Sequence, residues 1–259
     1  MTRRWLIIVT LTIGFSALAF GGAFGQSPQL LEDDATRYTV LGDSIAAGYK
    51  AQPATNGFAY RLYNMGVFDR LPHTLFCNSA VPGATSFDVL NYQVPQTLIP
   101  YALGGFNPKY VVMTVGGNDL LKILAWVATH PGYTLEELMA VVTQVLIDFG
   151  YNLGVILSQL TTGLPDVKIF VANLYLIPEL DVLVPGTGLI IQAFNGTVST
   201  VAGYFPSRVF VVDIYTAFEG RNGLFLVDRH GASPTEVHLT NAGHAAMARA
   251  FADVIKQYK

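Results

Sequence analysis

Four short polar segments of the sequence hold residues whose types and spacing suit acyl-transfer chemistry. Ser44 directly follows the apolar run that ends in VLGD, and Gly83 lies in the segment NSAVPGATS. Asn118 lies in VGGND, and His238 comes just before the last helical pattern of the chain. In an open parallel sheet, ligands bind beyond the carboxyl ends of the strands, where strands give way to loops and helices. We therefore expect these four residues to meet at one edge of such a sheet.

A serine, a histidine and nearby N–H donors are the groups that acyl transfer needs. A serine hydroxyl is a weak nucleophile, and a neighbouring histidine can take its proton near neutral pH. The tetrahedral intermediate carries negative charge on the former carbonyl oxygen, where each preorganised donor contributes on the order of 3 kcal/mol. We expect these donors to be the backbone N–H groups of Ser44 and Gly83 and the side-chain amide of Asn118. The start of a helix at Ser44 adds the positive end of its dipole.

The elements that must position these residues alternate between strands and helices. Short runs rich in Val, Ile, Phe and Tyr predict strands, and longer amphipathic patterns predict helices. The predicted strands are Tyr38–Leu41, Thr74–Asn78, Tyr110–Val115, Val167–Asn173 and Arg208–Ile214. The predicted helices are Phe58–Val67, Ser86–Tyr92, Thr134–Leu160, Leu189–Tyr204 and Thr240–Gln257. This alternation indicates a single α/β domain over residues 37–259, in which helices cover both faces of a mostly parallel five-stranded sheet.

Four blocks of the sequence resemble the motifs of the SGNH (GDSL) hydrolase family. They are GDSIAAG, the Gly83 of NSAVPGATS, VGGND, and the histidine followed by LTNAGH, in the order found in that family. The run VVDIYTAF with the later RNGLF also looks like secreted bacterial members. The resemblance implies a flavodoxin-like three-layer sandwich with Ser44 as nucleophile and His238 as base. It also implies an oxyanion hole formed by Ser44, Gly83 and Asn118.

The sequence departs from the family at the residue that should orient the imidazole of His238. Members usually carry an aspartate three residues before the histidine, and here that position holds Thr235. Glu236 is the favoured substitute, because its longer side chain offsets the shorter spacing. Alternatively, Thr235 or a backbone carbonyl orients the ring, or Asp228 does. Whichever group it is must bond the far ring nitrogen and fix its tautomer.

The first 25 residues have the pattern of a secretory signal peptide. Arg3 and Arg4 precede an uncharged apolar run, and small residues follow through Gly25. We expect cleavage near Gly25, a polar linker over residues 26–36, and a secreted protein that is extracellular or periplasmic. The alternative is an uncleaved anchor, although the apolar run is short for a bilayer span of about 20 residues.

The composition limits the kinds of partner and cofactor. Hydrophobic residues make up 51% of the chain and charged residues 13%, which provides ample material for a core. The formal net charge of −3 becomes −5 without Arg3 and Arg4, and the lack of a basic cluster argues against nucleic acid. The single cysteine, Cys77, is expected in the core. We expect no metal and no organic cofactor, because the sequence has no pattern of metal ligands.

These features together predict a secreted serine esterase or lipase that hydrolyses carboxylic esters through an acyl-enzyme. We expect a small-molecule or lipid-like ester as substrate, a monomer, and no membrane span after signal cleavage. One alternative is a carbohydrate O-acetylesterase, in which Tyr49, Phe58 or Trp126 stacks on sugars. The other is a catalytically inactive binding module.

Other polar residues near the motifs are expected to support structure. Asp43 and Asp119 flank two of the proposed loops and are expected to hold them through backbone N–H groups. His244 lies on the last predicted helix and is expected to pack or cap. His230 is the one rival to His238 as the base. The apolar pattern within Thr134–Leu160 is interrupted by acidic and amide residues, which favours an amphipathic surface helix over a membrane span.

Overall fold

The computed structural model describes residues 36–69, 73–221, 223–227, 233 and 236–259. The predicted signal peptide and nearly all of the predicted linker lie outside the described residues. The same holds for Asp228, His230 and Thr235.

Within the described residues, five strands form one sheet in the order β2-β1-β3-β4-β5. The strands are β1 (Thr36–Gly42), β2 (Thr74–Asn78), β3 (Tyr110–Thr114), β4 (Lys168–Ala172) and β5 (Val209–Val212). All neighbouring strands pair in parallel. The predicted α/β class and the five strands are therefore confirmed, with strand ends within two residues of those expected.

The strand order places a topological switch point beside β1. The chain passes from β1 to β2 on one side and then returns to β3 on the other side. In sheets of this order, the loops at the carboxyl ends of the two strands diverge and leave a crevice between them. The loop that follows β1 begins with Asp43 and Ser44. The fold therefore puts the predicted nucleophile at the edge where such sheets bind ligands.

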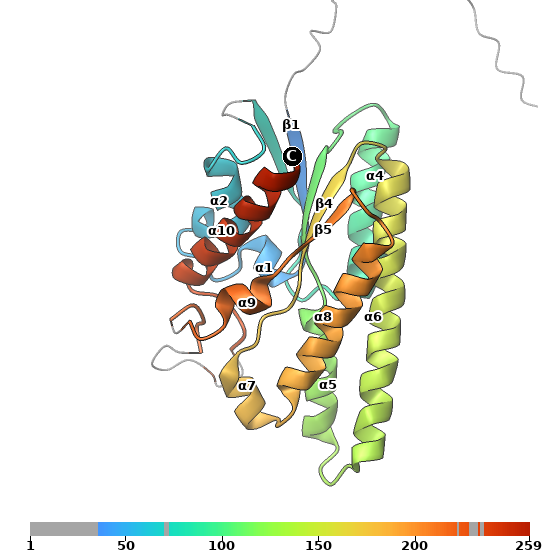
Figure 1. Cartoon of the computed structure of the whole chain (residues 1–259), viewed down its shortest axis with the longest axis vertical. Coiled ribbons are helices and arrows are strands. Elements are labelled where there is room, and N and C mark those ends of the chain that lie inside the picture. Colours follow the sequence, from blue (N-terminus) through green and yellow to red (C-terminus); the bar gives the residue numbers. More distant parts are fainter. Residues whose placement is uncertain (1–35, 70–72, 222, 228–232, 234–235) are drawn as a thin grey trace, which may run out of the picture. The chain divides into compact units, whose positions relative to one another are not determined.

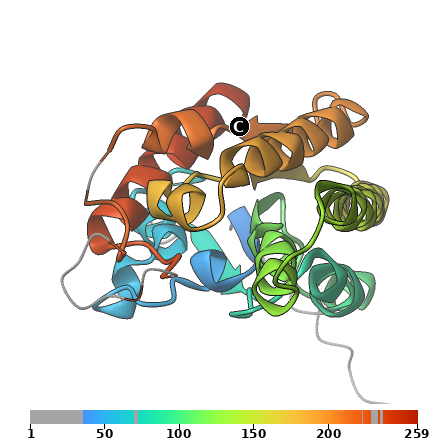
Figure 2. The ribbon, with the colours of Figure 1, turned by 90° about the horizontal axis from the view of Figure 1, so that it is seen from below.

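Helices cover both faces of the sheet (Figure 1, Figure 2). The longer helices are α2 (Phe58–Asn64), α4 (Val94–Ala102), α5 (Gly117–Thr129), α6 (Leu135–Gly163), α8 (Thr187–Gly203) and α10 (Asn241–Tyr258). The short ones are α1 (Ser44–Ala47), η1 (Ala54–Asn56), α3 (Ser86–Asp88), the π-helix η2 (Val89–Gln93), α7 (Pro178–Leu183) and α9 (Ile214–Phe218). Helices α2, α9 and α10 lie on one face, and α4, α5, α6 and α8 lie on the other.

Side chains alternate between the two faces of the sheet, as parallel strands require when both faces are buried. Val40 and Val112 point into the cluster that contains α2 and α10, whereas Leu41 and Met113 point into the cluster around α6 and α8. All four side chains are completely buried. The central strands are thus fixed from both sides, and the loops at their carboxyl ends start from rigid positions.

Two of the longer helices were not predicted, and one predicted helix has a different form. Helix α5 begins within the motif VGGND, and α4 contains Pro95 in its first turn and Pro100 in its interior. Proline usually interrupts helices, which hid α4 in the sequence, although the first turn tolerates it. The predicted helix Ser86–Tyr92 consists of the short α3 followed by the π-helix η2.

The expectation that Cys77 is a core residue is wrong. Cys77 lies on β2, which is the edge strand of the sheet, and its side chain is exposed. Leu75, on the same face of β2, is also exposed. The strand is apolar enough to look buried, but helices leave this face of the edge strand uncovered.

Helix α6 is the longest helix among the described residues. By length and composition it could cross a membrane. In the structure it lies along the sheet and buries Phe149, Leu153 and Ile156 against it. Its first turn is capped by Thr134, whose hydroxyl accepts a hydrogen bond from the Glu137 N–H. This arrangement agrees with the expected amphipathic surface helix.

Candidate active site

The serine loop is shaped by a glycine that no other residue could replace. Gly42 has a φ of +126°, and a Cβ at this position would lie 1.8 Å from the carbonyl oxygen of Thr114. The left-handed backbone and the close approach both require glycine. The chain therefore turns sharply at the end of β1 and presents Ser44 as the first residue of α1.

Asp43 fixes this turn, as expected from the sequence. Its Oδ1 accepts hydrogen bonds from the Ile45 N–H, at 3.0 Å, and from the Thr114 hydroxyl, at 2.7 Å. Burial raises the pKa of the Asp43 carboxyl, although the hydrogen bonds from Thr114 and Ile45 oppose that effect. Asp43 thus joins the loop after β1 to the end of β3 and takes no visible part in contacts with His238.

His238 lies beside Ser44. Its Nε2 is 3.1 Å from the Ser44 Oγ, across 194 residues of sequence. The ring of Tyr49 packs edge-on against the imidazole, with the ring centroids 4.7 Å apart. Ser44 is buried, with 9% of its surface exposed, whereas the His238 side chain is 18% exposed. The pairing that the sequence suggested between these two residues is thus present in the geometry.

Glu236 contacts the other side of the same imidazole. Its Oε1 lies within hydrogen-bond distance of the His238 Nδ1 and also accepts from the His238 backbone N–H at 3.0 Å. Burial raises the pKa of the Glu236 carboxyl, but the hydrogen bonds and charge of His238 and the charge of Lys50 outweigh burial and lower it. The carboxylate is therefore ionised near neutral pH. Thr235 and Asp228, the competing candidates, lie outside the described residues.

Three N–H groups of the predicted oxyanion hole are free to bind a ligand. Among the described residues, the backbone N–H groups of Ser44 and Gly83 have no hydrogen-bond acceptor. Gly83 sits in an exposed turn with a φ of +85°. The Asn118 amide donates one hydrogen to the Ala84 carbonyl at 2.9 Å, which leaves its second hydrogen free for a ligand. The Ala84 bond also ties Asn118 to the Gly83 turn.

Asp119 anchors the loop that carries Gly83. Its carboxylate accepts from both the Ser86 backbone N–H, at 2.9 Å, and the Ser86 hydroxyl, at 2.8 Å. Asn152 of α6 donates to the same hydroxyl at 3.0 Å. This buried network supports the predicted structural role of Asp119 and holds the turn against α5 and α6.

Sequence reasoning missed two residues that support the site. Gln93, the last residue of the π-helix, is buried and bonds the backbone of Gly42. Tyr175 donates its hydroxyl hydrogen to the Val237 carbonyl, next to His238, at 2.8 Å. Neither residue belongs to a motif, and only the fold brings them to the catalytic loops.

Two of the three aromatic residues proposed to stack on sugars have other contacts. Phe58 is completely buried and stacks on Phe251 of α10. Trp126 stacks on His130, with ring centroids 4.6 Å apart. Tyr49 is the only one of the three that contacts His238 in the described structure.

The other described histidines make no hydrogen bond with Ser44. His73 and His130 are exposed. His244 is completely buried on α10, where its Nδ1 accepts from the Phe58 N–H at 3.4 Å. The expectation that His244 packs is confirmed.

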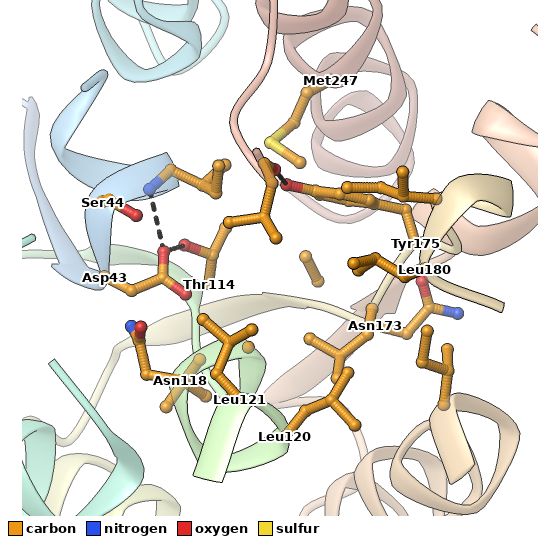
Figure 3. A pocket seen from close by; sticks show the side chains of 18 residues that line it. Asp43, Ser44, Thr114, Asn118, Leu120, Leu121, Asn173, Tyr175, Leu180 and Met247 are labelled. Carbon is orange, nitrogen blue, oxygen red and sulfur yellow. Dashed lines mark hydrogen bonds between the residues drawn. The ribbon is translucent and has the colours of Figure 1, made fainter. Parts of the chain in front are cut away.

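A cavity opens beside Ser44 and extends between the carboxyl ends of the strands and helices α5, α7 and α8 (Figure 3). Its interior volume is about 80 Å³, and it opens to solvent at its mouth. Ser44 and Asn118 lie on one side in Figure 3, and Tyr175 and Leu180 on the other. No cluster of three or more potential metal ligands occurs among the described residues. The arrangement combines a serine hydroxyl in contact with an imidazole, free N–H donors and a neighbouring cavity, which are the groups that acyl transfer needs.

Comparison with known families and structures gives one consistent result. Residues 40–246 match the model of the GDSL-like lipase/acylhydrolase family. No curated protein matches the chain.

Several solved structures share the fold at low sequence identity. A lipase from a goat rumen metagenome aligns with a TM-score of 0.66 and 20% identity, covering 85% of this chain and 97% of its own. An extracellular lipase from Streptomyces rimosus aligns with a TM-score of 0.62 and 16% identity, covering 87% and 100%. A variant of an acetyl xylan esterase from Geobacillus stearothermophilus aligns with a TM-score of 0.57 and 18% identity, covering 86% and 96%. At identities of 20% or less, these similarities show that the fold is shared.

Proposed function

Because the chain belongs to the GDSL-like lipase/acylhydrolase family, we propose that it is a serine esterase that hydrolyses carboxylic esters through an acyl-enzyme. The observation that carries this proposal is the 3.1 Å contact between the Ser44 Oγ and the His238 Nε2. A base at this distance can accept the hydroxyl proton directly. The supporting contact is that of Glu236 with the opposite ring nitrogen.

Acylation begins when the Ser44 oxygen attacks the ester carbonyl carbon and His238 takes its proton. Glu236 holds the tautomer with hydrogen on Nδ1, which leaves Nε2 free to act as the base, and its charge stabilises the imidazolium that forms. The tetrahedral intermediate then collapses. The bond to the alcohol oxygen breaks, and His238 returns the proton to that oxygen.

The negative oxygen of the intermediate is stabilised by the N–H groups of Ser44, Gly83 and Asn118. Two of these donors have no other acceptor among the described residues, and the Asn118 amide keeps one hydrogen free. They are held in place before substrate binds, so little reorganisation is needed as charge develops. In deacylation, a water molecule takes the place of the alcohol, and His238 removes its proton as it attacks the acyl carbon. The bond to the Ser44 oxygen then breaks, His238 returns the proton to Ser44, and the carboxylic acid leaves.

The test is hydrolysis of p-nitrophenyl acetate and longer p-nitrophenyl esters by the parent protein and by Ser44→Ala. We expect the parent to release p-nitrophenol and the variant to lose at least about 10³-fold in kcat. Equal rates from the two proteins would favour the inactive binding module. A panel that includes acetylated xylan separates the esterase from a carbohydrate O-acetylesterase, which would prefer the polysaccharide to the aryl acetate.

We also propose that the protein is exported through its N-terminal segment. The support is the sequence pattern of two arginines, an apolar run and small residues through Gly25. N-terminal sequencing of the protein recovered outside the cytoplasm tests this proposal. A mature chain that begins near Gln26 is expected, whereas a chain that still begins at Met1 or Thr2 in the membrane fraction would favour the uncleaved anchor.

A further inference from the structure

The cavity beside Ser44 is lined mainly by aliphatic side chains. Leu120 and Leu121 come from α5, and Leu180 comes from α7 (Figure 3). Ile191 comes from α8, and Ala172 ends β4. Leu120, Leu180 and Ile191 are each at most 6% exposed, so these walls belong to the packed interior. A mostly apolar cavity of this kind suits a hydrocarbon group, whose transfer from water to an apolar environment is favourable.

The position of the cavity relative to the catalytic groups identifies which part of an ester it can hold. Ser44 and Asn118 line it, whereas the imidazole of His238 does not. The alcohol oxygen must approach the His238 Nε2 to receive its proton, and the carbonyl oxygen must face the N–H donors. The remaining substituent of the carbonyl carbon is the acyl chain, and it is the one that can extend away from His238 into the cavity.

A second hollow beside Gly83 is the rival position for the acyl chain. It is lined by Asp88, Tyr92 and Gln96 together with residues of the Gly83 turn. Hydrogen bonds from Thr85 lower the pKa of the Asp88 carboxyl, so the group is ionised near neutral pH. The ionised Asp88 and the exposed Gln96 amide make this hollow a poor place for hydrocarbon. Asp43 and Asn173 also line the first cavity, but their polar atoms have hydrogen-bond partners within the protein.

We infer that the cavity bounded by Ala172, Leu180 and Ile191 binds an aliphatic acyl chain, and that its walls set the chain length of the ester. This inference rests on the proposed esterase activity. Two features of the wall make it a determinant of length. Ala172 is a small, buried lining residue, and we expect a larger side chain there to take up part of the space. Leu180 is contributed by the short helix α7, whose Asp181 Oδ1 accepts from the Gly188 N–H at 2.9 Å and ties α7 to α8.

The experiment measures kcat/KM for p-nitrophenyl esters from acetyl to dodecanoyl. In the parent protein we expect kcat/KM to rise by about fourfold for each added methylene until the chain fills the cavity, and then to fall. Ala172→Leu is expected to move the maximum to shorter chains and to lower the octanoate-to-acetate ratio by about tenfold or more. Leu180→Ala is expected to move the maximum to longer chains. Because a change in the core can reduce folding, Leu121→Trp, at a partly exposed lining residue, is the second variant that fills the cavity. Thermal unfolding is recorded for each protein.

The matched control is Gln96→Leu, which changes the exposed hollow beside Gly83. It is expected to leave the chain-length profile unchanged. A profile that shifts with Gln96→Leu and stays fixed with Ala172→Leu and Leu121→Trp would overturn the inference, as would a flat profile in the parent. These outcomes differ from a failure of the proposed function, in which Ser44→Ala would hydrolyse acetate as fast as the parent.

Discussion

The side-chain amide of Gln93 forms two hydrogen bonds with the backbone of Gly42, one from the Gly42 N–H to its Oε1 at 2.7 Å and one from its Nε2 to the Gly42 carbonyl at 2.8 Å. Strand β2 no longer pairs with β1 at this point, because the register ends at Val40 and Asn78. Gln93 therefore continues the hydrogen bonding of β1 up to the residue before Asp43. A π-helix places this side chain, and π-helical turns are frequent at functional sites.

Loss of the Gln93 amide is expected to destabilise the serine loop. The Gly42 carbonyl also accepts from the Val81 N–H and keeps that partner, whereas the Gly42 N–H would be left buried and unpaired. Such a group costs about 1–3 kcal/mol. We expect Gln93→Leu to lower the free energy of unfolding in urea by this amount and to reduce kcat. Asn91→Ala, an exposed change in the same π-helix, is the control, and equal stability of Gln93→Leu and the parent would contradict the prediction.

Glu236 is expected to be the residue whose loss most impairs His238 as a base. Without it the imidazole loses the partner that fixes its tautomer, so we expect Glu236→Ala to lower kcat by about 10²-fold or more, with less effect on KM. Because the pKa of Glu236 is lowered, its ionised form persists below the usual range, and this support for His238 is lost only as pH falls through that lowered pKa.

The comparison for Glu236 uses three further variants. Asp228→Ala and Thr235→Ala test the residues that sequence reasoning left open, and Glu219→Gln changes an exposed carboxylate. All three are expected to retain most of the parent kcat. A larger loss in Asp228→Ala than in Glu236→Ala would show that Asp228 orients the ring.

The Asn118 amide is expected to act on the transition state. Asn118→Ala should lower kcat by about 10²–10³-fold and leave KM nearly unchanged, since the donor bonds the oxyanion more strongly than the substrate carbonyl. Its bond to the Ala84 carbonyl also supports the Gly83 turn, so urea unfolding is measured in parallel. Asn64→Ala on the surface of α2 is the control. If Asn118→Ala increases KM and leaves kcat unchanged, Asn118 binds the substrate and not the transition state.

The sequence predicted the parts of the site that depend on local chemistry. Ser44, Gly83 and Asn118 follow strands whose ends are marked by glycine and by changes in polarity, and these signals lie within a few residues of each site. The proximity of Glu236 to His238 was also accessible, because both residues belong to one short segment. Their roles remain proposals that the variants above test.

The parts that were missed depend on contacts between distant segments. Gln93 bonds a residue 51 positions away, and it does so from a π-helix, which has no sequence signature that we could use. Cys77 was misplaced because β-propensity predicts a strand without showing whether helices cover it. Tyr175 follows β4 and reaches Val237 across 62 residues, a contact that only the packed fold defines.

The Tyr175 hydroxyl is expected to position the loop that carries His238. We expect Tyr175→Phe to remove one hydrogen bond, worth about 1 kcal/mol, and to lower kcat about threefold to tenfold with KM little changed. Because Phe keeps the stacking on Phe218 and Phe225, folding should persist. A displaced His238 should also shift the acidic limb of the pH profile of kcat/KM, which a purely structural loss would not do. Tyr215→Phe, which removes a more exposed hydroxyl, is the control.

His244 is expected to limit stability in acid. Burial, together with the charges of Arg61 and His238, lowers its pKa from 6.5 to about 4, although a backbone hydrogen bond opposes this shift. The unfolded chain therefore binds a proton below pH 6.5 that the folded chain does not bind until about pH 4. The free energy of unfolding therefore decreases as the pH is lowered from 6.5 to about 4, by about 3 kcal/mol from this residue alone.

His244→Gln removes that titration, and its amide oxygen can still accept from the Phe58 N–H. Urea unfolding of the parent and the variant at pH 7.5 and pH 4.5 measures the effect. We expect the loss of unfolding free energy between the two pH values to be smaller in the variant by about 2–3 kcal/mol, since groups that do not interact with His244 titrate alike in both proteins. The exposed His130→Gln should leave the difference unchanged. An equal loss of free energy in the parent and in His244→Gln would contradict the prediction. It would mean that His244 accepts a proton in the folded protein at nearly its ordinary pKa. Water would then have to reach its Nε2, which has no partner among the described residues.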